Sequence, residues 1–271
     1  MADYIQLQFD AVTEDQSAMI LALLSEEGFE GFEEEAGSLK AYLPADAWTE
    51  EKKQLVQSII AFPYTQSLIG ETNWNALWES NFSPVTVRDF VTVRADFHPP
   101  AAGVCHEIVI MPKMSFGTGH HATTFMMLEA MAAIPFAGKN VLDFGTGTGV
   151  LAILAEKLGG SSITAVDNDP WSIENAAENA RKNQCSRIRL SLADEIPAGS
   201  MFDIILANIN RNVLLEHMER LKAQLLPGGT ILLSGLLTAD EEIMRQSIAL
   251  AELQVTGRTE RANWLLLKVS A

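Results

Sequence analysis

The sequence contains little cysteine, no long apolar run and few basic residues, and each shortage excludes a class of protein. Cys105 and Cys185 are the only cysteines, and they lie far apart. Without partners at metal-ligand spacing, they predict reduced buried thiols, no disulfide framework and no metal site. No segment approaches about 18 uninterrupted apolar residues, and no basic stretch leads into an apolar run at the N-terminus. We therefore expect a soluble, cytoplasmic protein.

Basic residues are outnumbered throughout, with 19 Lys and Arg against 35 Asp and Glu and a formal net charge of −16. Such a chain repels polyphosphate and favours cationic partners, so we expect no direct binding of nucleic acid. Lys40, Lys52 and Lys53 are the only basic residues before Arg88, whereas six glutamates crowd residues 26–35. This acidic stretch is either a solvated helix end or loop, or a docking face for a basic protein.

The length of 271 residues exceeds the roughly 100–200 residues typical of one domain, and apolar residues make up 48% of the chain. We expect two unequal domains. Within residues 1–68, apolar residues either alternate with polar ones or recur at helical spacing, which predicts a small α+β domain. Its expected strands are residues 3–9 and 39–43, and its expected helices are residues 14–27 and 50–60.

A linker at residues 69–84 is expected to contain a short aromatic helix, NWNALWESNF at residues 73–82. The second domain then spans residues 85–271. Short strands are expected at residues 90–93 and 107–111. The segment SFGTGHHATT, residues 115–124, is rich in glycine and polar residues and predicts an irregular loop.

Beyond this loop, apolar strands and helices alternate regularly. The expected strands are residues 140–144, 162–167, 188–192, 203–208, 229–234 and 263–269. The expected helices are residues 123–133, 149–158, 170–182, 211–225 and 239–250. Strands that alternate with helices of ten to fifteen residues require right-handed crossovers, so the pattern predicts an α/β fold with a doubly wound, mainly parallel sheet.

Ligands of such sheets bind beyond the carboxyl ends of the strands, and two of these ends carry telling residues. Gly145, Gly147 and Gly149 follow the strand 140–144 and allow close approach of the backbone to a ligand. Asp167 ends the next strand, where a carboxylate can accept both hydroxyls of a ribose. A dinucleotide fingerprint places its third glycine one residue later, at Val150, so the spacing favours a nucleoside over a pyrophosphate.

A third strand end reads Ala207-Asn208-Ile209-Asn210. An asparagine side chain there can offer its oxygen to a substrate amine without carrying charge. Asparagine is also a preferred helix N-cap. The residues alone leave both roles open for Asn208 and favour the cap for Asn210.

Five segments of the sequence together resemble one known family. They are VLDFGTGTGVLAILAEKLG (141–159), AVDNDP (165–170), ANIN (207–210), NWNALWESNFSPV (73–85) and FGTGHHATT (116–124). The first three resemble the class I methyltransferases in general, which have a seven-stranded Rossmann-like sheet. The last two resemble the linker and loop of the family that methylates ribosomal protein eleven of the large subunit. The resemblance covers residues 73–271, and the first seventy residues match it in layout only.

The resemblance implies a role for six residues. Those implied to contact the cofactor S-adenosylmethionine are Thr124, Gly145, Gly147, Asp167 and Asn208. Phe116 is implied to lie over the reactive end of the cofactor. The chain departs from the family pattern at His120-His121-Ala122, where Thr-His-Pro is usual, so a structural or solvated role is the simpler interpretation of both histidines.

The implied activity is protein N-methylation, with lysine side chains and the N-terminus of the basic ribosomal protein as substrates. The first domain would recognise that protein, and the enzyme would act as a monomer. A neutral lysine amine costs about 4.6 kcal/mol at pH 7, and a neutral terminal amine about 1–1.4 kcal/mol. Our hypothesis is that Asn208 orients the amine and Phe116 shapes a pocket that tolerates cations, with no general base identified. Such a pocket could accept successively methylated amines, which agrees with the trimethylation that the resemblance implies.

Other substrates remain open at this stage. A methyltransferase of this class could act on another protein, on RNA or on a small-molecule amine. Amino-group methylation of bases usually comes with Asn-Pro-Pro-aromatic at the third strand end, which the chain lacks. A binding module without activity would show no cofactor binding.

Overall fold

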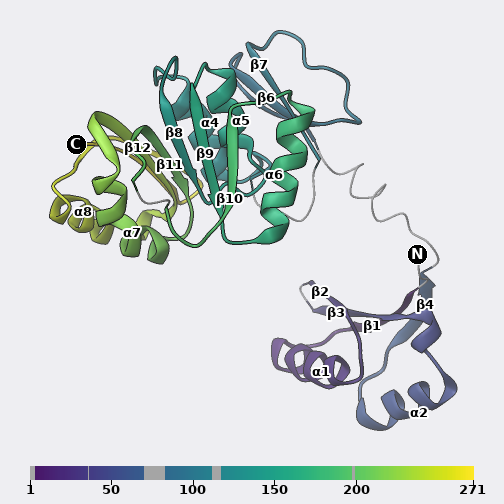
Figure 1. The fold of residues 1–271 in the computed structure, drawn as a ribbon. Coiled ribbons are helices and arrows are strands. Elements are labelled where there is room, and N and C mark those ends of the chain that lie inside the picture. The colour runs from purple at the N-terminus through teal and green to yellow at the C-terminus, as the bar shows by residue number, and fades with distance from the viewer. Residues whose placement is uncertain (1–3, 36, 70–82, 112–116, 197–198) are drawn as a thin grey trace. The chain divides into compact units, whose positions relative to one another are not determined.

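The computed structural model describes residues 4–35, 37–69, 83–111, 117–196 and 199–271. The chain divides into two compact units, Met1–Phe82 and Ser83–Ala271 (Figure 1). The aromatic helix expected at residues 73–82 lies outside the described residues. No helix in the described part of the chain is both long and apolar enough to cross a membrane.

The first unit is a four-stranded antiparallel sheet, in the order β2-β3-β1-β4, with two helices packed on one face (Figure 1). Its elements are β1 (Tyr4–Asp10), α1 (Glu14–Glu26), β2 (Gly31–Glu35), β3 (Ser38–Pro44), η1 (Ala45–Ala47), α2 (Glu50–Ile59) and β4 (Thr65–Ile69). Strand β1 buries Ile5, Leu7 and Phe9 because alternate side chains point to one face. Helix α1 begins at a capping box, in which Thr13 and Gln16 satisfy each other's backbone N–H groups.

The acidic stretch that could have been a helix end or loop is partly a strand. Residues 31–35 form β2 at the edge of the sheet, paired with β3. Glu33 lies opposite Lys40, and its carboxylate is 3.5 Å from the Lys40 ammonium and accepts a 2.9 Å hydrogen bond from Tyr42. Glutamate is depleted in strands, which explains why β2 was missed.

The second unit is built on a seven-stranded sheet in the order β10-β9-β8-β11-β12-β14-β13. Its strands are β8 (Asn140–Phe144), β9 (Ser162–Asp167), β10 (Ile188–Leu192), β11 (Phe202–Asn208), β12 (Leu225–Leu237), β13 (Gln254–Arg261) and β14 (Trp264–Ser270). The first five strands of the order run parallel, and β14 and β13 are antiparallel to their neighbours. The predicted doubly wound, mainly parallel sheet is confirmed.

Helices cover both faces of this sheet (Figure 1). They are α4 (Ala122–Met131), α5 (Val150–Lys157), α6 (Pro170–Lys182), α7 (Arg211–Ala223) and α8 (Glu241–Leu250), with η2 (Thr238–Asp240) before α8. Helices α7 and α8 share an apolar cluster with Leu142 and Phe144 of β8. Between these two, Asp143 points to the opposite face, where it meets α5. Helix α4 begins at Ala122, one residue before the expected helix 123–133, and so takes up the end of the segment 115–124 that was expected to be irregular.

A small third sheet of β5 (Val85–Val87), β6 (Val91–Ala95) and β7 (His106–Ile110) packs against α6. Two asparagines hold it: Asn183, which caps the end of α6, exchanges hydrogen bonds with the backbone of Val109, and Asn179 of α6 accepts one from Met111 N. The cysteines are not both buried as expected. Cys105 is exposed, and Cys185 is half-buried with its thiol pKa raised to about 11, mainly by burial.

Candidate functional site

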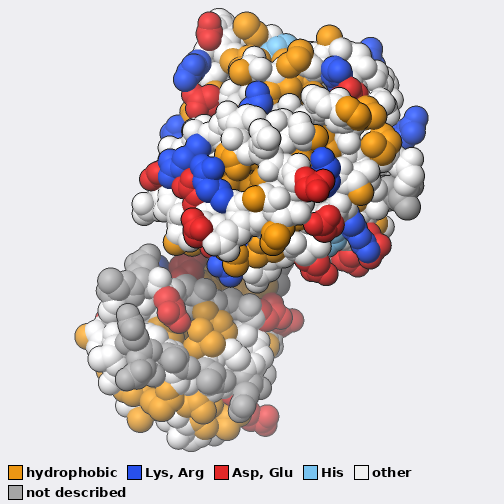
Figure 2. Space-filling model, turned by 90° about the vertical axis from the view of Figure 1, so that its left-hand side faces the viewer, with side chains coloured by type: hydrophobic (Ala, Val, Ile, Leu, Met, Phe, Trp, Pro, Cys, Tyr) orange, Lys and Arg blue, Asp and Glu red, His pale blue; other side chains and the backbone are white. Residues whose placement is uncertain are grey.

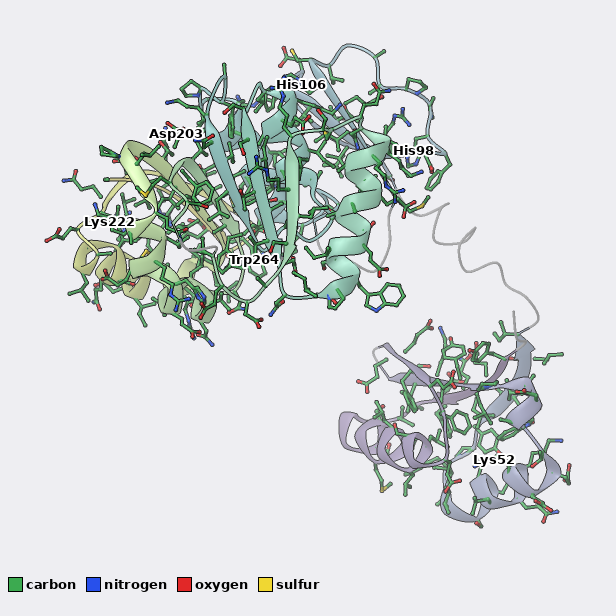
Figure 3. The ribbon with its side chains drawn as sticks, viewed as in Figure 1. Lys52, His98, His106, Asp203, Lys222 and Trp264 are labelled. Atoms are coloured by element: carbon green, nitrogen blue, oxygen red, sulfur yellow. The ribbon has the colours of Figure 1, made fainter. Side chains whose placement is uncertain are left out.

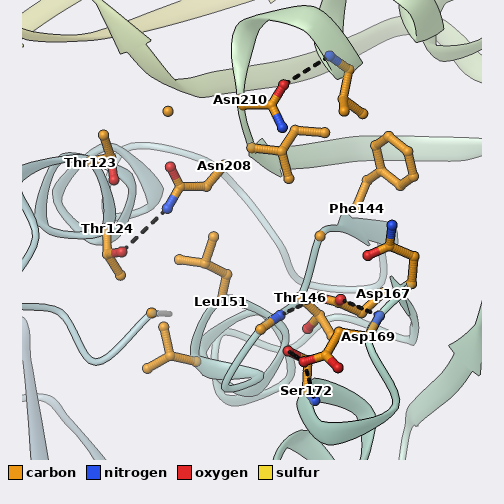
Figure 4. Close-up of a pocket in the computed structure, with 18 of the residues that line it drawn as sticks. Thr123, Thr124, Phe144, Thr146, Leu151, Asp167, Asp169, Ser172, Asn208 and Asn210 are labelled. Carbon is orange, nitrogen blue, oxygen red and sulfur yellow. Dashed lines mark hydrogen bonds between the residues drawn. The ribbon is translucent and has the colours of Figure 1, made fainter. Parts of the chain in front are cut away.

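A cavity of about 670 Å³ opens at the carboxyl edge of the seven-stranded sheet, within the size range of small-molecule sites (Figure 4). Trp264, which lines it, and Asp203, at the amino end of β11, lie at opposite edges of the sheet (Figure 3). The cavity brings together five residues that the sequence singled out. They are Thr124, Gly145, Gly147, Asp167 and Asn208.

The glycine turn after β8 forms the middle of the cavity wall. Gly145, Gly147 and Gly149 all have positive φ, at 79°, 53° and 78°, which favours glycine. A Cβ added at Gly145 would collide with the side chain of Ile209 at the end of β11. The turn therefore presents bare backbone to the cavity, as the sequence predicted.

The carboxylate of Asp167 is held in place at the end of β9. It accepts hydrogen bonds from Gly147 N at 2.8 Å and from Asp169 N at 3.0 Å. Asp169 caps helix α6 by accepting from Trp171 N and Ser172 N, and the Ser172 hydroxyl holds the pKa of Asp169 below its usual range. A carboxylate offers about four acceptor positions, so Asp167 retains capacity for a ligand's hydroxyls.

Asn208 ends β11 on the other side of the glycine turn. Its side-chain nitrogen donates to the Thr124 hydroxyl at 3.2 Å, and its Oδ1 is buried without a hydrogen-bond partner in the described part of the chain (Figure 4). A buried acceptor without a donor costs free energy, which indicates a ligand that supplies one. Asn210 accepts from Val213 N at 3.2 Å and caps α7, as expected.

The loop before α4 is fastened to the glycine turn. The Thr148 hydroxyl donates to the Gly117 carbonyl at 2.8 Å. His120 bonds to the Ser83 carbonyl oxygen at 2.9 Å, and His121 caps α4, so both histidines have structural roles. Phe116, the residue implied to cover the reactive end of the cofactor, lies outside the described residues.

Sequence reasoning missed Asp143, a fully buried carboxylate directly beneath the glycine turn. One oxygen accepts from the Thr146 hydroxyl at 2.6 Å and from Ala152 N at 3.2 Å, and the other has no partner among the residues described. Burial, together with the charge of nearby Asp167, raises the pKa of Asp143 to about 7, although the hydrogen bonds from Thr146 and Ala152 act in the opposite direction. The signal available in the sequence was a lone charge within an otherwise apolar strand.

Two more cavity residues were missed because they lie far along the chain. Gly235 of β12 has φ 82°, and a Cβ there would lie 2.7 Å from the carbonyl carbon of Ile209. Trp264 begins β14. Neither belongs to a local motif that indicates a site.

The strand order sets the layout of the site. Strands lie about 4.8 Å apart, and β8 separates β9 from β11, so Asp167 and Asn208 stand roughly 10 Å apart across the glycine turn. The site thus has a carboxylate that can accept from hydroxyls at one end, bare backbone in the middle and an amide oxygen at the other end. This arrangement suits an extended nucleoside-type ligand.

Comparisons with known proteins give the family. Residues 8–271 match the family described as Ribosomal protein L11 methyltransferase (PrmA). Relatives with that name include the Porphyromonas gingivalis protein, 40% identical over 92% of this chain and 89% of its own length. The Phocaeicola vulgatus protein is 34% identical over 98% of both chains. The match begins at residue 8, so the first unit shares more than a layout with the family.

Solved structures agree with the fold. The ribosomal protein L11 methylase of Lactobacillus delbrueckii subsp. bulgaricus superposes with a TM-score of 0.65 at 26% identity, over 70% of this chain and 98% of its own. A Pyrococcus furiosus methyltransferase shares the fold with a TM-score of 0.51 at 19% identity, over 60% and 87% of the two chains. The chain belongs to the ribosomal protein L11 methyltransferase family.

Proposed function

We propose that this protein transfers methyl groups from S-adenosylmethionine to lysine side-chain and N-terminal amino groups of ribosomal protein L11. The observation that carries the proposal is the alignment of Asp167, the glycine turn and Asn208 along one sheet edge. The family supplies the substrate.

The residues present fit this cofactor. The remaining acceptor positions of Asp167 suit the two ribose hydroxyls, and the glycine turn allows the nucleoside to lie against the backbone. Thr124 and Asn208 would then border the sulfonium end. When bound, the cofactor supplies an electrophilic methyl group.

The protein's main task is to present a neutral amine in line with that methyl group. The partnerless Oδ1 of Asn208 can accept an N–H of the amine, which directs the nitrogen lone pair without adding charge. A buried site beside a sulfonium disfavours the ammonium form, so it lowers the pKa of the bound amine. Phe116 is proposed to shape the cation-tolerant side of this pocket.

Replacement of Asn208 by alanine is expected to lower kcat/KM for L11 about tenfold at saturating cofactor, since one buried hydrogen bond is worth about 1–3 kcal/mol. Initial rates with radiolabelled cofactor measure the effect. The control is Asn140→Ala, at the amino end of β8 and remote from the cavity. Full turnover by the Asn208 variant would remove this residue from the mechanism.

We further propose that the first unit recognises the substrate. Residues 1–82 contain 15 acidic and 3 basic residues, so they carry −12 of the chain's net charge of −16. In contrast, Figure 2 shows Lys and Arg interspersed with Asp and Glu over the second unit. The negative charge of this unit favours the binding of a basic ribosomal protein. We propose that the enzyme acts in the cytoplasm as a monomer and makes no direct contact with nucleic acid.

A charge reversal at exposed Glu34 of β2 tests this role. Glu34→Lys is expected to raise the KM for L11 about threefold and to leave kcat unchanged, because the charge acts on capture alone. Glu219→Lys, on the exposed face of α7, is the matched control. Equal KM values for the two variants would contradict recognition by the first unit.

The decisive experiment supplies radiolabelled S-adenosylmethionine and total ribosomal protein, and identifies the labelled band by mass spectrometry. Label on L11 at lysine or terminal amines is expected. Label on another protein, on RNA added in parallel or on no macromolecule would overturn the proposed substrate.

A further inference from the structure

Trp264 lines the cavity on the side opposite Asp167, the residue proposed to bind the ribose. It begins β14, lies opposite Leu237 of β12, and lines the cavity. Along the sheet edge the order is β9, β8, β11, β12, β14, so Trp264 stands two strand spacings beyond Asn208, on the side opposite Asp167. At about 4.8 Å per strand this is roughly 10 Å across the strands. Trp264 also lies three residues farther along the strand direction, because Asn208 pairs with Ser234 and Trp264 pairs with Leu237. Asn208 and Trp264 line the same cavity, so a substrate amine bound at Asn208 can lie on the Trp264 side of it.

The ring of Trp264 is fixed from the side of α4. His121 packs against it edge to face, with ring centroids 4.5 Å apart and planes at 71°. His121 is itself held by a 2.7 Å contact between its Nδ1 and the Thr123 hydroxyl at the start of α4. The ring of Trp264 is thus packed against a residue that is itself tied to the start of α4.

The hairpin that carries Trp264 is fastened as well. The Arg261 guanidinium lies 3.7 Å above the ring of Phe125 in α4. The turn residues Ala262 and Asn263 have φ of 49° and 65°, and the Asn263 carbonyl accepts a 2.9 Å hydrogen bond from Thr238 N. These contacts hold the hairpin tip to both α4 and η2.

The amine changes its chemistry as methyl groups accumulate. In each transfer the nitrogen lone pair forms a bond to the methyl carbon, the carbon–sulfur bond breaks, and its electron pair stays on sulfur. After the first and second transfers the ammonium releases a proton to solvent, which restores a lone pair. A neutral primary amine has two N–H groups, a secondary amine has one and a dimethylated amine has none. Asn208 Oδ1 can therefore orient the primary and the secondary amine, but not the dimethylated amine.

We propose that Trp264 positions the dimethylated amine for the third transfer and so determines whether the product is trimethylated. An aromatic face needs no N–H; it contacts methyl groups and stabilises the quaternary cation that the third transfer creates. The hydrogen bond to Asn208 thus orients the amine in the first two transfers, and the ring of Trp264 positions it in the third. This inference rests on the proposed function.

The test follows intact mass of L11 over time with wild-type enzyme, Trp264→Leu and Trp264→Phe. The leucine variant is expected to slow the third transfer at least tenfold, to keep the first two within about threefold, and to accumulate dimethylated product. The phenylalanine variant restores most trimethylation because it keeps an aromatic face. In Asn208→Ala the pattern reverses, with the first transfer slowed most.

Two further readouts separate this role from a structural one. Melting temperature and cofactor affinity are expected to stay at wild-type values in Trp264→Phe, and a trimethyl-lysine peptide should bind more weakly to Trp264→Leu than to wild type. Equal slowing of all three transfers by Trp264→Leu, or unchanged trimethylation, would overturn the inference and leave the proposed function standing. Failure of the wild-type enzyme to methylate L11 would overturn both.

Discussion

Alanine at Gly235 is expected to reduce methyl transfer about 100-fold, whereas alanine at Gly138 leaves the rate at the wild-type level. Both glycines have similar positive φ, 82° and 74°, so the two variants share a backbone cost of about 1–2 kcal/mol. A Cβ at Gly138 would meet nothing within 4 Å, but at Gly235 it would overlap the backbone of Ile209. Ile209 directly follows Asn208, and a displacement of about 1 Å in a reacting geometry can cost about 100-fold in rate.

Cofactor titration, initial rates and urea unfolding of the two variants measure these effects. The Gly235 variant should lose about 1–3 kcal/mol more stability than the Gly138 variant, the usual range for overpacking. Similar rates in both variants would show that the contact between β12 and Ile209 does not set the position of Asn208.

The second large effect is a pH dependence of stability caused by Asp143. Its pKa is about 7 in the folded protein and near the ordinary 3.8 when unfolded. The folded state therefore holds the proton more tightly, so the associated stability is complete below about pH 4 and is lost as the pH rises through 7. Between pH 5 and 8 the loss amounts to about 3 kcal/mol.

Asp143→Asn isolates this contribution because it retains an oxygen acceptor for Thr146 and Ala152 but cannot ionise. The free energy of unfolding, measured with urea at several pH values, should favour the variant over wild type increasingly from pH 5 to 8. The other titrating groups cancel in the difference. Parallel profiles for the two proteins would show that Asp143 titrates normally.

The fold was most predictable where burial dictates the sequence. Strands β8 and β9 and helix α6 were predicted with the bounds observed, residues 140–144, 162–167 and 170–182, because buried apolar residues and the Asp169-Pro170 helix start mark them clearly. The missed strands β2, β4, β5 and β13 all lie at sheet edges. Their residues are polar or few, and pairing with a neighbour holds them in place, which no local pattern reveals.

Some residues of the site were likewise predictable from the sequence, and others were not. Gly145, Asp167 and Asn208 end three parallel strands, and parallel strands place their carboxyl ends at one edge, so their proximity followed from the pattern. Trp264 reaches that edge only because β14 runs antiparallel between β12 and β13. Strand order of this kind depends on long-range packing, and it is invisible in a segment examined alone.

The boundary between Phe82 and Ser83 has an evolutionary consequence. Among the described residues, those that line the cavity lie between Gly117 and Trp264, within the second unit. On the proposed role of the first unit, selection for a different target protein would act on residues 1–82 while the residues of the cavity are inherited unchanged. Target choice and catalytic rate are then separately heritable traits of a single polypeptide.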